Sequence, residues 1–196
     1  MKKAIIAIVL AALILFGASL GLNGIAASNA QKAHLELMQT ILPGSETFTV
    51  EPYDGEDANI VSVHKAENGF VIETVTYGYA DNITMLIGVN NEGKVTGLVV
   101  QEAHETVGLG NQALTDHVFL AQFLNKSGSF AVATTGEADA FSGATGTTDT
   151  AEGETIDVDA LTGATVTSKA VVRCVNSAVA YVTGADAASS ATTWGG

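Results

Sequence analysis

The first hydrophobic stretch of the chain extends from Ala4 to Leu22 and contains no charged residue. As a helix rising about 1.5 Å per residue it would reach roughly 28 Å, close to the ~30 Å thickness of a bilayer hydrocarbon core. Lys2 and Lys3 precede it, so the positive-inside rule predicts a cytoplasmic N-terminus. We therefore expect residues 1–30 to form a transmembrane anchor and linker in the cell membrane, single-pass, with the remaining chain on the extracytoplasmic side.

A cleaved signal peptide is the alternative interpretation of these residues, because Ser28-Asn29-Ala30 is a tolerable small-x-small cleavage site. The apolar stretch is longer than the roughly 7–15 residues of a usual signal-peptide core, which favours an uncleaved anchor. Both interpretations place the rest of the chain outside the cytoplasm.

Four later segments are rich in Val, Ile, Thr and Tyr and alternate partly between apolar and polar positions, a pattern typical of β-strands. They are Ile60–His64, Gly69–Tyr79, Ile83–Val89 and Lys94–Gln101. The connections between them contain Asn and Gly, which tolerate the positive φ of tight turns, or Asn with Asp. This order predicts an antiparallel meander.

Three segments space their apolar residues at helical intervals: Gln31–Ile41, Leu114–Leu124 and Lys169–Val182. The first ends before Pro43-Gly44 and leads into the domain. The last carries a stripe of valines, which predicts one buried helix face. Ser127–Glu154 is rich in Gly, Ser, Thr, Ala and Asp, and we expect a loop or a weakly structured hairpin there.

This succession predicts an α+β fold, in which an antiparallel sheet is packed with helices and preceded by one N-terminal transmembrane helix. We expect an extracytoplasmic domain over residues 31–183 and a flexible tail over residues 184–196. The net charge of the 196-residue chain is −13. Because an acidic domain repels phosphodiester backbones, we predict no nucleic-acid partner.

Cysteine and histidine usage narrows the possible chemistry. Cys174 is the only cysteine, which excludes an intramolecular disulfide, a four-thiolate iron–sulfur site and a CxxC redox pair. The four histidines show no metal-ligand spacing, so we predict no metal site. If electrons pass through this protein, an organic cofactor must carry them.

The segment from Asp159 to Ser168 precedes the valine-striped helix and is rich in small residues. Small residues allow close approach to the backbone, and a helix N-terminus offers unpaired N–H groups, which together suit a phosphate. Lys169 and Arg173 follow Thr165 on one helix face, where an anion would explain them. The alternative is that Thr167 or Ser168 simply caps the helix; chemistry alone leaves both open.

The residues Asp159-x-x-Thr162-Gly163-Ala164-Thr165 resemble the Dxx(S/T)GAT flavinylation motif of the FMN-binding domain family. This family includes the G subunit of the Rnf ion-translocating ferredoxin:NAD oxidoreductase, to which the resemblance is greater, and the C subunit of the sodium-pumping NADH:quinone oxidoreductase. Upstream, the stretch from Glu105 to Gly110 resembles the family's ETPGLG loop, with Val107 in place of proline. The resemblance runs from the anchor to about Tyr181.

The resemblance implies that a separate flavin transferase attaches FMN to Thr165 through a phosphoester bond. It implies a cofactor site made of two groups of residues. These are Thr162, Gly163, Ala164, Thr165, Thr167, Ser168 and Lys169 around the phosphate, and Glu105, Thr106, Gly108, Leu109 and Gly110 near the isoalloxazine edge. No catalytic residue beyond the flavin is expected.

By the same resemblance the chain is an electron-carrying subunit of an Rnf-type membrane complex, which couples electron transfer between ferredoxin and NAD to Na⁺ or H⁺ translocation. Its partners are then the other membrane subunits. Two alternatives stay open at this point. One is a stand-alone membrane-anchored FMN carrier for an extracellular reductase, and the other is an acidic surface domain without a cofactor.

The motif occurs twice in the sequence. Asp139-Ala-Phe-Ser142-Gly-Ala-Thr145 repeats the pattern 20 residues before the second copy. No cation and no helical stripe follow Thr145 in the sequence, so we predict Thr165 as the flavin acceptor. A second flavin on Thr145 is the minor hypothesis.

Overall fold

The computed structural model describes residues 29–105, 110–133 and 155–185. The chain divides into two units, Met1–Leu37 and Met38–Gly196. Residues 29–41 are helical, which confirms the predicted helix at this position. In the described part of the chain, no helix combines the length and apolar character needed to cross a membrane. The predicted span between Ala4 and Leu22 lies outside the described residues and stays a prediction.

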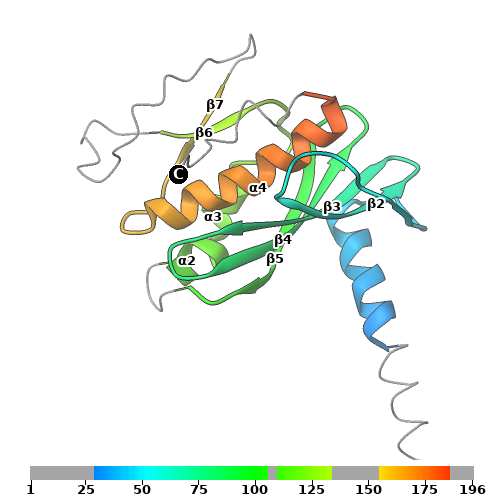
Figure 1. Ribbon diagram of the computed structural model, residues 1–196, viewed down its shortest axis with the longest axis horizontal. Coiled ribbons are helices and arrows are strands. Elements are labelled where there is room, and N and C mark those ends of the chain that lie inside the picture. The colour runs from blue at the N-terminus through cyan, green and yellow to red at the C-terminus, as the bar shows by residue number, and fades with distance from the viewer. Residues whose placement is uncertain (1–28, 106–109, 134–154, 186–196) are drawn as a thin grey trace, which may run out of the picture. The chain divides into compact units, whose positions relative to one another are not determined.

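Five strands form an antiparallel sheet in sequence order, which confirms the predicted meander (Figure 1). They are β1 (Thr49–Glu51), β2 (Ile60–Ala66), β3 (Gly69–Tyr77), β4 (Asn82–Asn90) and β5 (Val95–Ala103). The sequence did not predict β1, because three residues are too few to show alternation. The third strand ends two residues earlier than expected, since the amides of Tyr79 and Ala80 donate to a side chain instead of continuing the ladder.

One face of the sheet is covered by helix α4 (Thr165–Thr183), which lies across β3 and β4 (Figure 1). Its apolar stripe is buried at Val171, Val175 and Val179, as the valine spacing predicts. Alternate residues of β4, such as Met85 and Ile87, belong to the same core. The helix begins four residues before the predicted start, so Thr165 is its first residue.

The opposite face of the sheet is covered by residues 38–42. Successive strand residues point to opposite faces, so Leu86 and Gly88 lie on the side away from Met85 and Ile87. Gly88 pairs with Gly97 of β5, and a Cβ at either glycine would meet the carbonyl oxygen of Ile41 at 2.6–2.7 Å. Because the paired glycines have no side chains, the backbone at Ile41 can pack directly against the sheet.

The sequence predicted one continuous helix over Leu114–Leu124, and this prediction is wrong. The structure has two short helices instead, α2 (Gly110–Thr115) and α3 (His117–Ala121). Asp116 has extended backbone angles and its Oδ1 accepts hydrogen bonds from the amides of Val118 and Phe119 at 2.8 and 3.0 Å. Such an N-cap starts a new helix, which is why the apolar periodicity alone misjudged the segment.

The remaining strands form a small parallel pair, β6 (Phe130–Ala133) with β7 (Ile156–Asp159). The expectation of a loop or hairpin over residues 127–154 is therefore wrong at its start, because Phe130–Ala133 pairs with a strand beyond the segment. The side chain of Asn176 on α4 binds both backbone groups of Phe130, each at 2.9 Å. This double hydrogen bond fixes the pair to the central helix.

Candidate functional site

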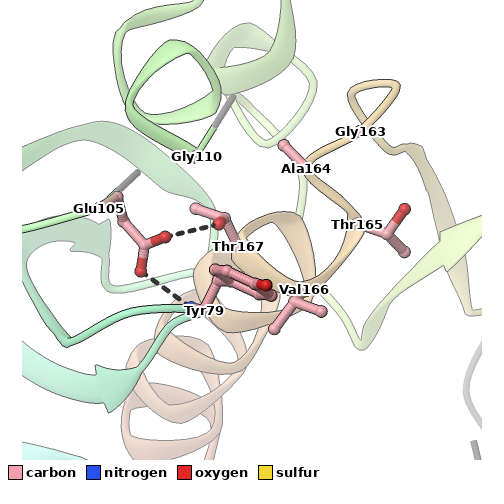
Figure 2. A pocket seen from close by; sticks show the side chains of 8 residues that line it. All are labelled: Tyr79, Glu105, Gly110, Gly163, Ala164, Thr165, Val166 and Thr167. Atoms are coloured by element: carbon pink, nitrogen blue, oxygen red, sulfur yellow. Dashed lines mark hydrogen bonds between the residues drawn. The ribbon is translucent and has the colours of Figure 1, made fainter. Parts of the chain in front are cut away.

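A cavity of about 370 Å³ lies at the N-terminal end of α4. Figure 2 shows that three separate parts of the chain form its walls. Tyr79 comes from the turn after β3, Glu105 follows β5, and Gly110 is at the start of α2. Residues 163–167 come from the turn before α4 and from its first turn. The volume is in the usual range for a small-molecule pocket.

The backbone turns sharply into α4 just before the helix begins. Gly163 has a φ of +79°, a conformation that favours glycine. Ala164 is the N-cap residue, and its methyl side chain has no acceptor for the N–H groups of the first turn. These N–H groups carry the partial positive charge of the helix N-terminus, which favours a negatively charged group nearby.

The predicted alternative, in which Thr167 or Ser168 caps the helix, is wrong. Both residues lie inside the first turns of α4 and both are buried. Ser168 Oγ donates to the carbonyl oxygen of Ala164 at 3.0 Å and accepts from the amide of Leu161 at 3.3 Å. The hydroxyl of Ser168 therefore holds the turn together from within.

The four hydroxyl groups of this segment differ in their availability. Thr162 is exposed, in the turn before the helix, and Ser168 is fully buried. Thr167 is 1% exposed and donates to Glu105 Oε2 at 3.1 Å. Thr165 is half-buried and lines the cavity, and Figure 2 shows its side chain on the side of the turn away from Glu105. Thr165 is thus both partly accessible to solvent and located at the helix N-terminus.

Glu105 connects the walls of the cavity. Its Oε1 accepts hydrogen bonds from the amides of Tyr79 and Ala80 at 2.8 and 3.3 Å, while its Oε2 accepts from Thr167. A Cβ at Gly78 or Gly110 would overlap the Glu105 carboxylate, so a side chain at either position would displace it. The glycine in each neighbouring segment lets the backbone approach the carboxylate.

The two cations of α4 have different positions. Arg173 donates to Thr76 Oγ1 at 3.2 Å and to the carbonyl oxygen of Tyr77 at 2.8 Å, so it attaches α4 to β3. The expectation that Arg173 serves an anion beside Thr165 is therefore wrong. Burial lowers the pKa of its guanidinium, which stays protonated at neutral pH. Lys169 is half-buried and one turn after Thr165, where its charge suits an anion at the helix start.

The structure brings many of the predicted site residues to the cavity. Those that line it are Glu105, Gly110, Gly163, Ala164, Thr165 and Thr167. Thr106, Gly108 and Leu109 lie outside the described residues, as does Thr145 of the upstream motif.

The sequence did not single out two other residues of the cavity wall, Tyr79 and Val166. They are 66% and 47% exposed, respectively. Tyr79 is the last residue of the predicted strand Gly69–Tyr79, so nothing in the strand pattern indicated that its side chain lies in a turn. Together the two side chains offer an apolar surface beside the N-terminus of α4.

Comparison with known proteins gives one match to a family model. The model is described as the FMN-binding domain and matches residues 78–180, more than half of the chain. The matched range begins at the turn that carries Tyr79 and ends within α4.

Individual relatives agree with this match. The G subunit of the ion-translocating oxidoreductase complex from Haemophilus influenzae, strains PittEE and 86-028NP, is 30% identical over 117 residues. The alignment covers 49% of this chain and 53% of each relative, so the chain spans about half the length of the curated relatives it matches. A crystal structure of Shewanella oneidensis NqrC matches at 22% identity and a TM-score of 0.45, covering 70% of this chain and 65% of that chain.

Proposed function

Because the chain belongs to the FMN-binding domain family, we propose that its cavity holds FMN, joined by a phosphoester bond to the hydroxyl oxygen of Thr165. The observation that carries this proposal is the position of Thr165. It is the first residue of α4, half-buried, and part of the cavity wall. A phosphate on its Oγ1 would lie at a helix N-terminus, where the macrodipole stabilises negative charge.

The residues around Thr165 fit FMN in their chemistry. Gly163 and Ala164 leave the backbone of the helix start accessible, and Lys169 adds a positive charge one turn away. Tyr79 and Val166 supply an apolar and aromatic surface of the kind that packs against a flat ring system. When bound, FMN would supply the redox chemistry, and the residues of the chain bind and orient it.

The attachment reaction is balanced if FAD is the donor. The Thr165 oxygen forms a bond to the phosphorus of the FMN half, and the phosphoanhydride bond of FAD breaks. AMP leaves with the electron pair of the broken bond, and the hydroxyl proton is released. We assign this reaction to a separate flavin transferase. The half-buried position of Thr165 leaves its oxygen accessible to such an enzyme, whereas the hydroxyl of Ser168 is fully buried.

We extend the proposal to an electron-carrying subunit of a membrane complex that couples ferredoxin–NAD electron transfer to Na⁺ or H⁺ movement. The named relatives are subunits of an ion-translocating oxidoreductase complex, which supports this assignment. In this proposal, residues 1–30 anchor the chain with the FMN domain outside the cytoplasm, and the other membrane subunits are its partners. Recovery of a tagged full chain from native membranes without any other membrane subunit would contradict it.

The acceptor is tested by producing the full chain together with a flavin transferase. Intact mass spectrometry and in-gel fluorescence under denaturing conditions measure covalent flavin. We expect one FMN on the wild-type chain and none on Thr165→Val. The matched controls Thr162→Val, in the same turn, and Thr145→Val, in the upstream motif, should keep it. FMN remaining on Thr165→Val would overturn the assignment.

A further inference from the structure

The carboxylate of Glu105 binds two parts of the chain that are far apart in sequence. Tyr79 and Ala80 belong to the turn after β3, and Thr167 belongs to the first turn of α4. These are the two walls between which the cavity opens (Figure 2). We propose that Glu105 is a positioning residue that fixes the separation of these walls and thereby the orientation of the group bound at Thr165. This inference rests on the proposed function.

The hydrogen bonds of Glu105 leave little capacity for a ligand. An ionised carboxylate has about four acceptor positions, and three donors from the chain already use both oxygens. Hydrogen bonds to a charged acceptor are shorter and stronger than those between neutral groups. Glu105 therefore acts on the site through the residues that it holds, whereas the sequence had suggested a direct contact with the flavin.

The surroundings of Glu105 are built for this contact. Gly78 stands directly before Tyr79, and Gly110 is the first residue of α2. A side chain at either glycine would occupy the space of the carboxylate. Both segments thus pass close to the Glu105 carboxylate.

Thr167 transmits this constraint to the acceptor. It is two residues after Thr165, in the first turn of α4, and 1% exposed. Figure 2 shows the Thr167 hydroxyl directed at Glu105 and the Thr165 side chain on another side of the turn. The hydrogen bond therefore sets the rotation of the first turn and leaves Thr165 free of contact with the carboxylate.

The test uses the full chain with Glu105→Ala and the conservative Glu105→Gln. The glutamine carbonyl oxygen can still accept from the amides of Tyr79 and Ala80, and its amide group can donate to Thr167 Oγ1. Glu73→Ala is the matched control, because Glu73 also accepts from a hydroxyl, that of Ser62 at 2.8 Å, and does not line the cavity. Flavin-free and flavin-loaded chains are both measured.

In the flavin-free chain, we expect amide hydrogen exchange at Tyr79 and Ala80 to accelerate roughly ten-fold or more in Glu105→Ala. The reason is that each amide loses its hydrogen bond to a charged group. Glu105→Gln should restore most of the protection, and Glu73→Ala should leave it unchanged. In the loaded chain, Glu105→Ala should lower the fluorescence anisotropy and visible circular dichroism of the flavin, while covalent attachment persists.

Unchanged exchange at both amides and unchanged anisotropy in Glu105→Ala would overturn the positioning role. If Glu105→Ala does not fold, Thr167→Val removes one hydrogen bond at nearly constant volume and must lower the flavin anisotropy for the proposal to stand. A wild-type chain without covalent flavin would instead defeat the proposed function. The exchange measurement would still decide whether Glu105 holds the two walls.

Discussion

The guanidinium group of Arg173 donates a 2.8 Å hydrogen bond to the carbonyl oxygen of Tyr77, the last residue of β3. The same group binds Thr76 Oγ1. Tyr77 lies two residues before Tyr79, so this charged contact ties α4 to the strand that leads into one wall of the cavity. A position two turns inside α4 therefore supports the site without belonging to it.

Replacing this arginine should destabilise the domain. Arg173→Met keeps most of the apolar stem but leaves Tyr77 O and Thr76 Oγ1 without their charged donor. We expect a loss of about 1–3 kcal/mol in the free energy of unfolding, measured by urea denaturation followed by circular dichroism. The exposed Lys126 provides the control variant Lys126→Met, which should change stability by less than about 0.5 kcal/mol. Equal stability of the two variants would contradict the role of Arg173.

The paired glycines under Ile41 give a second prediction. In Gly97→Ala the new Cβ would meet the carbonyl oxygen and Cα of Ile41 at 2.7 and 2.9 Å, both rigid backbone atoms. We expect a loss of about 1–3 kcal/mol in unfolding free energy and faster proteolysis between residues 38 and 45. Gly184→Ala is the control, because Gly184 has a φ of +69° and no atom near its Cβ position. It should lose stability through backbone strain but keep the proteolysis rate.

The buried thiol of Cys174 gives a pH dependence of stability. Burial raises its pKa from 9.0 to about 11. Because the folded pKa is above the unfolded one, this contribution to stability is fully present below pH 9 and is lost as the pH rises towards 11. The loss should reach about 2–3 kcal/mol. Urea denaturation between pH 8 and 11 should show a smaller decrease for Cys174→Ala; an identical decrease would contradict this origin.

The cap of α3 gives a fourth prediction. Asp116→Ala removes the acceptor of two amide hydrogen bonds and should lower the unfolding free energy by about 0.5–2 kcal/mol. Asp116→Asn keeps a side-chain oxygen and should lose less. Thermal unfolding measured by circular dichroism distinguishes them. If alanine and asparagine are equally destabilising, the charge of Asp116 matters and the cap geometry does not.

Local patterns were sufficient to predict the sheet order and the buried face of α4. The strands of the meander are neighbours in sequence, and the valine spacing places Val171 and Val175 on one side of the helix. At the start of α4, the small residues and the lysine suited an anion, but short-range chemistry left a simple helix cap equally open.

Contacts between distant residues could not be predicted in this way. The hydrogen bond between Glu105 and Thr167 spans 62 residues, and the pairing of β6 with β7 depends on strands of four residues each. Such short strands have little periodicity of their own. Arg173 shows the same limit. Its helical spacing from Thr165 suggested that both residues serve one anion, whereas its guanidinium group binds the carbonyl oxygen of Tyr77.

The parallel pairing of β6 with β7 means that the chain must return from Ala133 to Ile156 before the pair can form. Extra length in such a connection costs little free energy, because closure entropy grows slowly with the number of residues. The upstream motif ending at Thr145 falls in this connection. In the second copy, residues 160–164 alone separate the end of β7 from the start of α4. A change in the length of residues 160–164 should therefore disturb the fold more than an equal change in length between Ala133 and Ile156.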